Sequence, residues 1–154
     1  MSNTNTIATN AVEIKFLAKD PGLLPVYATA GAAGADLKAC IDEAIVIPAH
    51  SAKLIPTGLF FEIPPGYEVQ VRPRSGLALK NHITVLNSPG TIDSDYRGEL
   101  QVILMNHSNV DFIVTPGMRI AQMVVAACLQ ATFIPSVELA ASERGAGGFG
   151  HTGM

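Results

Sequence analysis

Short apolar segments rich in β-branched residues, broken by proline and glycine, recur along this chain of 154 residues. Runs of this kind with turn residues between them are typical of β-strands joined by short connections. A helix needs apolar residues three and four positions apart, and this pattern is almost absent. The sequence therefore predicts an all-β sandwich or barrel with at most one short helix.

The expected elements follow the apolar runs and end where proline or glycine interrupts them. Strands are expected at residues 12–17, 24–27, 44–47, 53–55, 59–63, 68–71, 83–86 and 100–105, and a short helix at 75–80. We expect a disordered N-terminus at residues 1–10 and a single β-barrel domain at 11–135. Residues 136–154 are expected to form a C-terminal arm and a flexible glycine-rich tail.

Composition narrows the possible partners. The formal net charge is −3, which argues against a general nucleic-acid surface, although a local anion site is compatible with it. The longest apolar stretches, such as Ile120 to Leu129, are about half a membrane span, and no signal peptide is recognisable, so we expect no membrane partner. Cys40 and Cys128 match no metal or redox spacing, and reduced thiols in the cytoplasm are the expected state.

The stretch from Asn87 to Leu100 concentrates polar chemistry between two apolar runs. It holds Asp93, Asp95, Tyr96 and Glu99, and a Pro-Gly pair supplies a turn. The local pattern predicts a β-hairpin. Charged residues at a hairpin are either a solvated tip or a site on a rigid scaffold, and this stretch alone is compatible with both.

Two further stretches could face an anion. Thr29-Ala-Gly-Ala-Ala-Gly-Ala-Asp36 is a small-residue loop that closes on a carboxylate; alternatively it is a plain turn whose aspartate caps the backbone. Arg72-Pro-Arg-Ser-Gly76 places guanidinium groups and a hydroxyl before the predicted helix. This segment either faces solvent or binds an anion at the helix N-terminus.

The last two stretches lie nearer the C-terminus. Arg119-Ile-Ala-Gln122 places an arginine and an amide on an apolar run, where they could help to hold a phosphate chain. Alternatively, the arginine pairs with a surface carboxylate and the amide satisfies a backbone group. Residues 144–153 are mostly glycine, and their backbone N–H groups could approach phosphate oxygens closely. The tail's arginine offers a bidentate fork and its phenylalanine a flat face to a nucleobase. A flexible terminus without a role is the alternative.

Taken together and in this order, five segments resemble the motifs of the trimeric deoxyuridine triphosphatases (dUTPases). The five segments are residues 30–37, 73–78, 90–99, 117–123 and 144–153. The resemblance implies a β-barrel of jelly-roll type that hydrolyses dUTP to dUMP and pyrophosphate with Mg²⁺. The reaction limits uracil in DNA and supplies dUMP for thymidylate synthesis. It also implies a homotrimer with shared active sites, each taking its uracil hairpin, phosphate contacts and tail from different chains.

By this resemblance, Asp93 is the general base that activates the water attacking the α-phosphorus, a role that suits a rigidly held carboxylate. Asn87 reads the uracil edge, and Tyr96 packs under the deoxyribose and excludes a 2′-hydroxyl. Phe149 stacks on the uracil. The full set of substrate-binding residues implied is Arg74, Ser75, Gly76, Asn87, Thr91, Ile92, Tyr96, Gln122, Arg144, Gly148, Phe149, Gly150, His151 and Thr152.

For the metal, Asp36 is the expected outer-shell contact to Mg²⁺, through water. Asp95 could contribute in the same way or cap the hairpin. Arg97 and Glu99 are expected to be structural, paired with each other or with Arg72. At His151 the chain departs from the family, which more often has serine or threonine there.

Two other functions are weighed. The related dCTP deaminases share the fold and the trimer, but they typically carry a second serine after Arg-Ser, where this chain has Gly76. A non-catalytic trimeric scaffold that binds nucleotide is the other alternative. The presence of Asp93 together with a complete glycine-rich tail argues against such a scaffold.

Overall fold

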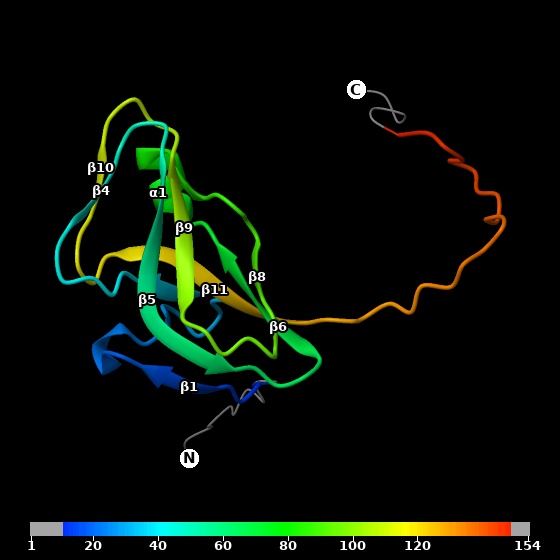
Figure 1. Ribbon diagram of the computed structural model, residues 1–154, viewed down its shortest axis with the longest axis horizontal. Coiled ribbons are helices and arrows are strands. Elements are labelled where there is room, and N and C mark those ends of the chain that lie inside the picture. Colours follow the sequence, from blue (N-terminus) through cyan, green and yellow to red (C-terminus); the bar gives the residue numbers. More distant parts are fainter. Residues whose placement is uncertain (1–10, 149–154) are drawn as a thin grey trace, which may run out of the picture.

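Two antiparallel sheets and a smaller two-stranded sheet form the body of the protein in a computed structural model, which describes residues 11–148 (Figure 1). The strands are β1 (Lys15–Ala18), β2 (Val26–Tyr27), β3 (Ala35–Lys38), β4 (Ile45–Ile47), β5 (Ala52–Glu62), β6 (Tyr67–Arg72), β7 (Ile83–Val85), β8 (Gly90–Ile92), β9 (Leu100–Asn106), β10 (Phe112–Val114) and β11 (Arg119–Ala127). A 3₁₀ turn, η1 (Pro21–Leu23), follows β1, and one α-helix, α1 (Ser75–Asn81), follows β6. The all-β prediction with one short helix is confirmed.

The order of strands in each sheet brings distant segments together. One sheet has the order β1-β5-β9-β7, and the second has the order β2-β3-β11-β6-β8. The small sheet pairs β10 with β4. Because β7 and β8 are near neighbours in sequence but belong to different sheets, the segment that connects them crosses from one layer to the other.

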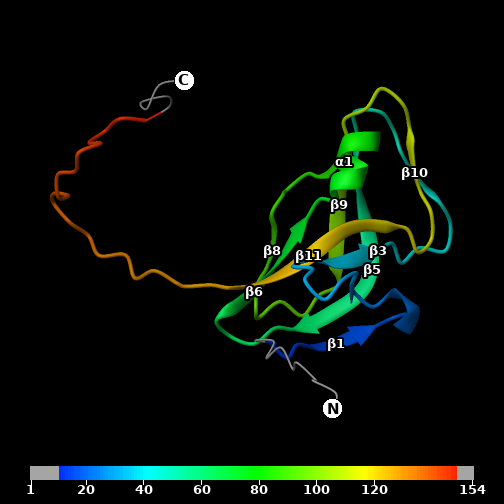
Figure 2. The ribbon, with the colours of Figure 1, turned by 180° about the vertical axis from the view of Figure 1, so that it is seen from behind.

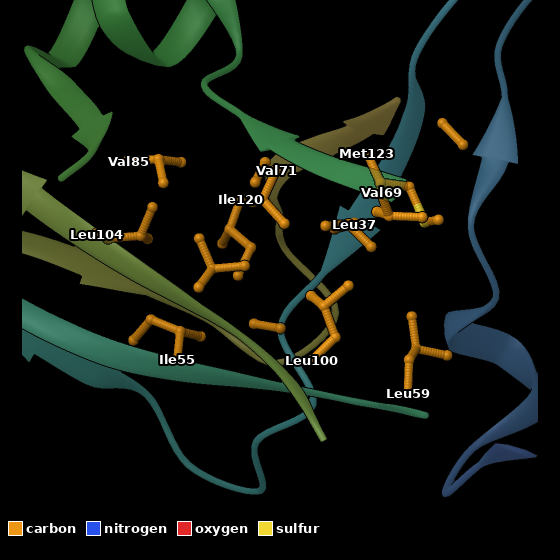
Figure 3. Packing of buried hydrophobic residues seen from close by; sticks show 14 of the residues in the cluster. Leu37, Ile55, Leu59, Val69, Val71, Val85, Leu100, Leu104, Ile120 and Met123 are labelled. Atoms are coloured by element: carbon orange, nitrogen blue, oxygen red, sulfur yellow. The ribbon is translucent and has the colours of Figure 1, made fainter. Parts of the chain in front are cut away.

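Alternation of buried and exposed side chains explains why the two sheets pack face to face. In β9, Leu100, Val102 and Leu104 are buried while their neighbours face outward. The buried residues of both sheets form one apolar cluster, in which Leu37 and Ile120 from the second sheet meet those of the first (Figure 3). Burying each such side chain contributes roughly 1.5–3 kcal/mol, so this cluster holds the layers together.

The two strands expected at residues 53–55 and 59–63 are one bulged strand, β5. Its register against β9 shifts between Pro56 and Leu59. Gly58 has a φ of +69°, and a Cβ at this position would lie 2.7 Å from the Cys40 sulfur. Only glycine fits this backbone without strain. Gly58 therefore marks a β-bulge and not the end of a strand.

The β-hairpin predicted from the runs at 83–86 and 100–105 is confirmed in its pairing, because these runs pair as β7 and β9, with Ile83 opposite Asn106. Its connection is not the simple turn expected at Pro89–Gly90. Gly90–Ile92 instead form β8, which pairs with β6 in the other sheet. The connection is therefore tied to the second sheet before the chain reaches the acidic segment.

Sequence reasoning left four strands unassigned, among them the nine-residue β11, whose residues were noted only as part of an apolar stretch. β3, β8 and β10 have four residues or fewer, and β3 consists mainly of small and charged residues. Such short strands form because neighbouring strands complete their hydrogen bonds, which local patterns do not reveal. The helix α1 was predicted, and His82 closes it in the left-handed conformation.

The chain leaves the body after β11. Residues 128–148 contain no helix or strand and run away from the sheets (Figures 1 and 2). The domain boundary at residue 135 stays a prediction, and the expectations for residues 1–10 and 149–154 fall outside the described residues. No helix among the described residues is long and apolar enough to cross a membrane.

Candidate active site

The acidic segment after β8 is folded into a tight turn. The Tyr96 N–H donates to the Asp93 carbonyl at 3.2 Å. The Arg97 guanidinium donates to the carbonyls of Ser94 and Tyr96, at 2.7 and 3.1 Å. Arg97 therefore braces the turn that carries Asp93, and within residues 11–148 it forms no ion pair with a carboxylate, contrary to the prediction. This geometry holds Asp93 and Tyr96 on one short rigid loop.

A cleft of about 210 Å³ opens beside this turn. Its lining includes five residues of the predicted site: Asn87, Thr91, Ile92, Asp93 and Tyr96. Glu99 and three outward side chains of the first sheet, Leu54, Gln101 and Ile103, complete it. The wall is thus part apolar and part amide or carboxylate, which suits a flat heterocycle with polar edges.

Glu99 has partners that the sequence did not suggest. We expected it to pair with Arg97 or Arg72, and both expectations are wrong. Glu99 instead forms a 2.8 Å ion pair with Lys19, and it accepts the Gly58 N–H at 2.8 Å. The Arg72 guanidinium is bound to the Gln70 side chain, which keeps it on its own strand.

The pKa of Lys19 lies above its ordinary value of 10.5, chiefly because the ammonium donates a hydrogen bond to Glu99. Lys19 accordingly stays charged at neutral pH and keeps the ion pair intact.

A second cleft, of about 390 Å³, lies over the outer face of the second sheet. Its lining combines small residues of the 28–34 loop with polar and charged side chains: Ala28, Ala32, Ala33, Gly34, Asp36, Arg74, Ser75, Gly76, Arg119 and Gln122. Register explains the grouping, because Gln122 on β11 lies opposite both Asp36 on β3 and Arg72 on β6. The sheet thus places three of the resembling segments, 30–37, 73–78 and 117–123, around one hollow.

Asp36 is the electrostatic centre of this second cleft. The Arg74 Nε donates to one carboxylate oxygen at 3.0 Å, and an Arg119 Nη donates to the other at 3.2 Å. Asp36 lies on β3 and does not cap the 29–36 loop, so that alternative is wrong. The carboxylate orders two guanidinium groups and leaves their remaining N–H donors for an anion.

The Gln122 side chain is held by a hydrogen bond to the backbone and by close contact with Gly34. Its Nε2 donates to the Pro73 carbonyl at 2.9 Å. A Cβ built on Gly34 would overlap the Gln122 amide, so a glycine is needed there. The expectation that Gln122 satisfies a backbone group is confirmed, and its amide also lines the cleft.

The structure gathers the predicted site residues into two groups, one in each cleft, and a third group lies apart on the arm. The two clefts share no lining residue. Arg144 and Gly148 lie on the extended arm, where Arg144 donates to the Gly147 carbonyl at 2.7 Å. The remaining predicted tail residues, Phe149, Gly150, His151 and Thr152, fall outside the described residues.

Two charged residues of the clefts were missing from the predicted site. Arg119 was read as part of a stretch that could hold phosphates or as an ion-pair partner; the ion pair, with Asp36, is confirmed, and Arg119 also lines the second cleft. Glu99 was read only as structural, and it lines the first. The sequence did offer a signal for both, because each is a charged residue inside a segment that resembles a family motif.

The described part of the chain, residues 11–148, contains no cluster of three or more histidine, cysteine or acidic groups able to hold a metal ion. A metal at the second cleft would therefore depend on ligands from the bound substrate and water.

The fold is that of a jelly-roll-like β protein whose surface carries two partly polar clefts. Solved structures with this fold include a mutant of the dUTPase of Staphylococcus bacteriophage 80alpha with dUpNHpp, at a TM-score of 0.79 and 22% identity over 94% of this chain and 100% of that one. A mutant dUTPase from phage phi11 of S. aureus, whose structure concerns a structural Mg(II) ion, has a TM-score of 0.75 and 18% identity over 84% of this chain and 100% of that one.

Sequence comparison gives the family. The dUTPase family profile matches residues 20–153. The deoxyuridine 5′-triphosphate nucleotidohydrolase of Chlamydia pneumoniae is 63% identical over 133 residues, which cover 86% of this chain and 92% of the relative. The chain belongs to the dUTPase family.

Proposed function

We propose that this protein hydrolyses dUTP to dUMP and pyrophosphate by attack of water on the α-phosphorus. The observation that carries the proposal is the family match across residues 20–153, because it takes in all five of the segments recognised in the sequence. The nucleotidohydrolase name of the Chlamydia relative supports the same reaction. The first cleft offers a partly apolar wall for a base and sugar, and the second offers guanidinium groups for phosphates.

Asp93 is the proposed general base. It lies in the first cleft on a turn braced by Arg97, and the described residues give its carboxylate no hydrogen-bond partner. An open carboxylate on a rigid turn can accept a proton from water while the water oxygen bonds to the α-phosphorus. The bond from the α-phosphorus to the bridging oxygen breaks, and its electron pair leaves with pyrophosphate.

Selection of the base and sugar is assigned to the same cleft. Asn87 offers an amide donor and acceptor to the uracil edge, and Thr91 and Ile92 present the β8 strand beside it. Tyr96 forms the wall under the sugar, where a 2′-hydroxyl would collide with the ring. Such a cleft would reject a mismatched base because the polar groups that the base covers would be left unpaired.

The triphosphate is assigned to the second cleft. Arg74 is already oriented by Asp36, while Ser75 and Gly76 begin the helix at the rim. Gln122 adds an amide on the opposite strand. Guanidinium groups held in place before binding lose little side-chain entropy when an anion arrives.

Complete sites require more than one chain in this proposal, as in the homotrimer implied by the resemblance. The separation of the two clefts within one chain supports this, since neither contains a full set of contacts. The arm also supports it: Phe133 is 91% exposed and Val137 fully exposed, and a second chain would cover them. Arg144, Gly148 and the tail residues Phe149, Gly150, His151 and Thr152 would then close a neighbour's site.

Mg²⁺ is the proposed cofactor, and the residues present fit it in a limited way. The Asp36 carboxylate uses two of its roughly four lone-pair positions on arginines, which leaves capacity to accept a hydrogen bond from a metal-bound water. When bound, the ion would neutralise phosphate charge. The structural Mg(II) ion of the phi11 enzyme is compatible with this choice.

The cytoplasm is the proposed location. Cys40 and Cys128 are both free thiols, as expected in a reducing compartment.

Hydrolysis in ¹⁸O-labelled water tests the reaction directly. Attack on the α-phosphorus places the label in dUMP, whereas attack on the β-phosphorus places it in pyrophosphate. Label in pyrophosphate alone would refute the proposed mechanism. Ammonia released from dCTP would instead identify a deaminase, and binding without turnover would identify a scaffold.

A further inference from the structure

Tyr96 is held in place by the residues immediately after it. Its hydroxyl donates to the Glu99 carbonyl at 3.1 Å. Its ring packs against Gly98, where an added Cβ would overlap the ring. The position of the ring therefore depends on where the backbone of Glu99 lies.

The Glu99 side chain is fixed at both of its oxygens. Oε1 accepts the Gly58 N–H and Oε2 accepts the Lys19 ammonium, each at 2.8 Å. Only 16% of the Glu99 side chain is exposed, so these charge-assisted bonds are partly shielded from water. We call this group of three residues, Lys19, Gly58 and Glu99, the clamp.

The β5 bulge creates the clamp. The register shift between Pro56 and Leu59 removes Gly58 from the regular ladder to β9, and its N–H points to Glu99 instead. Lys19 is attached to the same point, because its own N–H donates to the Gly58 carbonyl at 2.9 Å. Its ammonium also lies 5.8 Å from the centre of the Phe60 ring. The clamp thus joins the end of β1, the bulge of β5 and the start of β9.

We propose that Glu99 is a positioning residue that fixes Tyr96 and thereby sets the discrimination between deoxyribose and ribose. The inference rests on the proposed function, in which the Tyr96 ring excludes a 2′-hydroxyl. A carboxylate anchored at both oxygens holds its own backbone carbonyl still, and that carbonyl holds the tyrosine hydroxyl. Loosening the clamp lets the ring move away from the sugar and admits UTP.

The test compares kcat/KM for dUTP and UTP in Glu99→Ala, Glu99→Gln and Lys19→Met. Glu99→Ala is expected to lower the preference for dUTP about tenfold, with a rise in the KM for dUTP larger than the fall in kcat. Glu99→Gln keeps an acceptor for the Gly58 N–H, so its preference for dUTP should fall less. In Lys19→Met the preference should fall about two- to threefold, because an ion pair with one exposed partner contributes little.

The chain offers a matched control in the ion pair between β1 and β5. Lys15 and Glu62 are 3.2 Å apart and both largely exposed, so Lys15→Met and Glu62→Gln remove similar charges without reaching Tyr96. Both should keep the wild-type preference for dUTP. An equal loss in Glu62→Gln would overturn the assignment to Glu99, since it would indicate a general effect of charge.

Ring signals of the three tyrosines, Tyr27, Tyr67 and Tyr96, provide a readout that does not depend on turnover. In Glu99→Ala the Tyr96 signal should shift while the other two stay unchanged. A wild-type preference for dUTP in Glu99→Ala overturns the proposal whatever the ring signals do. If the wild-type protein hydrolyses neither nucleotide, the proposed function fails; the clamp is then judged by whether Glu99→Ala lowers selectivity for dUMP over UMP in binding.

Discussion

At the scale of single residues, the two aspartates of the clefts have opposite surroundings. Asp36 is bound on both oxygens by Arg74 and Arg119, so its charge is used to order guanidinium groups. Asp93 lies on a braced turn, and the described residues provide its carboxylate with no hydrogen-bond donor. This contrast supports giving the basic role to Asp93 and a supporting role to Asp36.

Replacing Asp93 by asparagine should lower kcat by about 10²–10⁴-fold, because the amide cannot accept the proton of the attacking water. Binding of a non-hydrolysable dUTP analogue, measured by calorimetry, should stay within a few-fold of wild type. Asp42→Asn, at an exposed carboxylate outside both clefts, is the control and should behave as wild type. Unchanged turnover in Asp93→Asn would remove Asp93 from the mechanism.

Gly34→Ala should raise the KM for dUTP about tenfold or more, because the new Cβ overlaps the Gln122 amide and displaces it from the cleft. Gly31→Ala in the same loop is the matched control, since nothing lies within 4 Å of its added Cβ. Steady-state kinetics of the two variants, with thermal unfolding as a check on the fold, decides the outcome. Equal KM values in both would contradict the positioning of Gln122 by Gly34.

The sequence indicated which residues line the first cleft more readily than which residues contact one another. Asp93, Asn87 and Tyr96 stand in one short segment, and the structure places them in one cleft. Lys19 and Glu99 are 80 positions apart, and only the β5 bulge brings them together. Their pairing could not have been predicted, because it depends on strand register and not on local pattern.

At the scale of elements, the bulge in β5 is the feature that shapes the first cleft. The buried Thr57 hydroxyl donates to the Leu100 carbonyl and accepts the Leu59 N–H at 3.3 Å. These bonds close the gap that the register shift opens between β5 and β9. The end of the turn that carries Asp93 and Tyr96 is therefore fixed by a side chain on a different strand.

Thr57→Val should lower the free energy of unfolding by about 1–3 kcal/mol, because it leaves buried backbone groups without their partner. Denaturant unfolding at equal chain concentrations measures the effect, since association of chains also contributes to stability. Thr115→Val, at an exposed position, should change stability by less than about 0.5 kcal/mol. A Thr57→Val variant as stable as this control would contradict the proposed role of the hydroxyl.

Element type was predictable where the signal was long or distinctive. The apolar runs of β6, β7 and β9 and the helix α1 lie where the sequence placed them. The β8 strand was mistaken for part of a hairpin turn, because its three residues pair with β6 only in the folded sheet. Gly58 was read as a break between strands because glycine marks turns and bulges alike.

At the scale of the whole molecule, the chain presents two partial sites and an apolar arm. Among the described residues the clefts have no lining residue in common. The arm after β11 runs away from the sheets (Figure 2). Such an arrangement is difficult to reconcile with catalysis by one isolated chain. A trimer that completes each site from several chains accounts for both features.

Complementation between inactive chains should restore activity. Asp93→Asn chains keep the arm, and chains ending before Arg144 keep Asp93. After co-refolding of an equal mixture, about a quarter of the sites would combine an intact base with an intact arm from different chains. Pyrophosphate release should then approach about a quarter of the wild-type rate. Activity no greater than that of the two variants refolded separately would contradict sharing of sites.

The central claim is the reaction itself, and pyrophosphate release with Mg²⁺ from dUTP, UTP, dCTP and dTTP at equal concentration tests it most directly. We predict turnover of dUTP, with rates at least about a hundredfold lower for the other three nucleotides. Such a result would support the assignments of Asn87 to the base and Tyr96 to the sugar. Comparable release from all four nucleotides, or none from dUTP, would contradict the account.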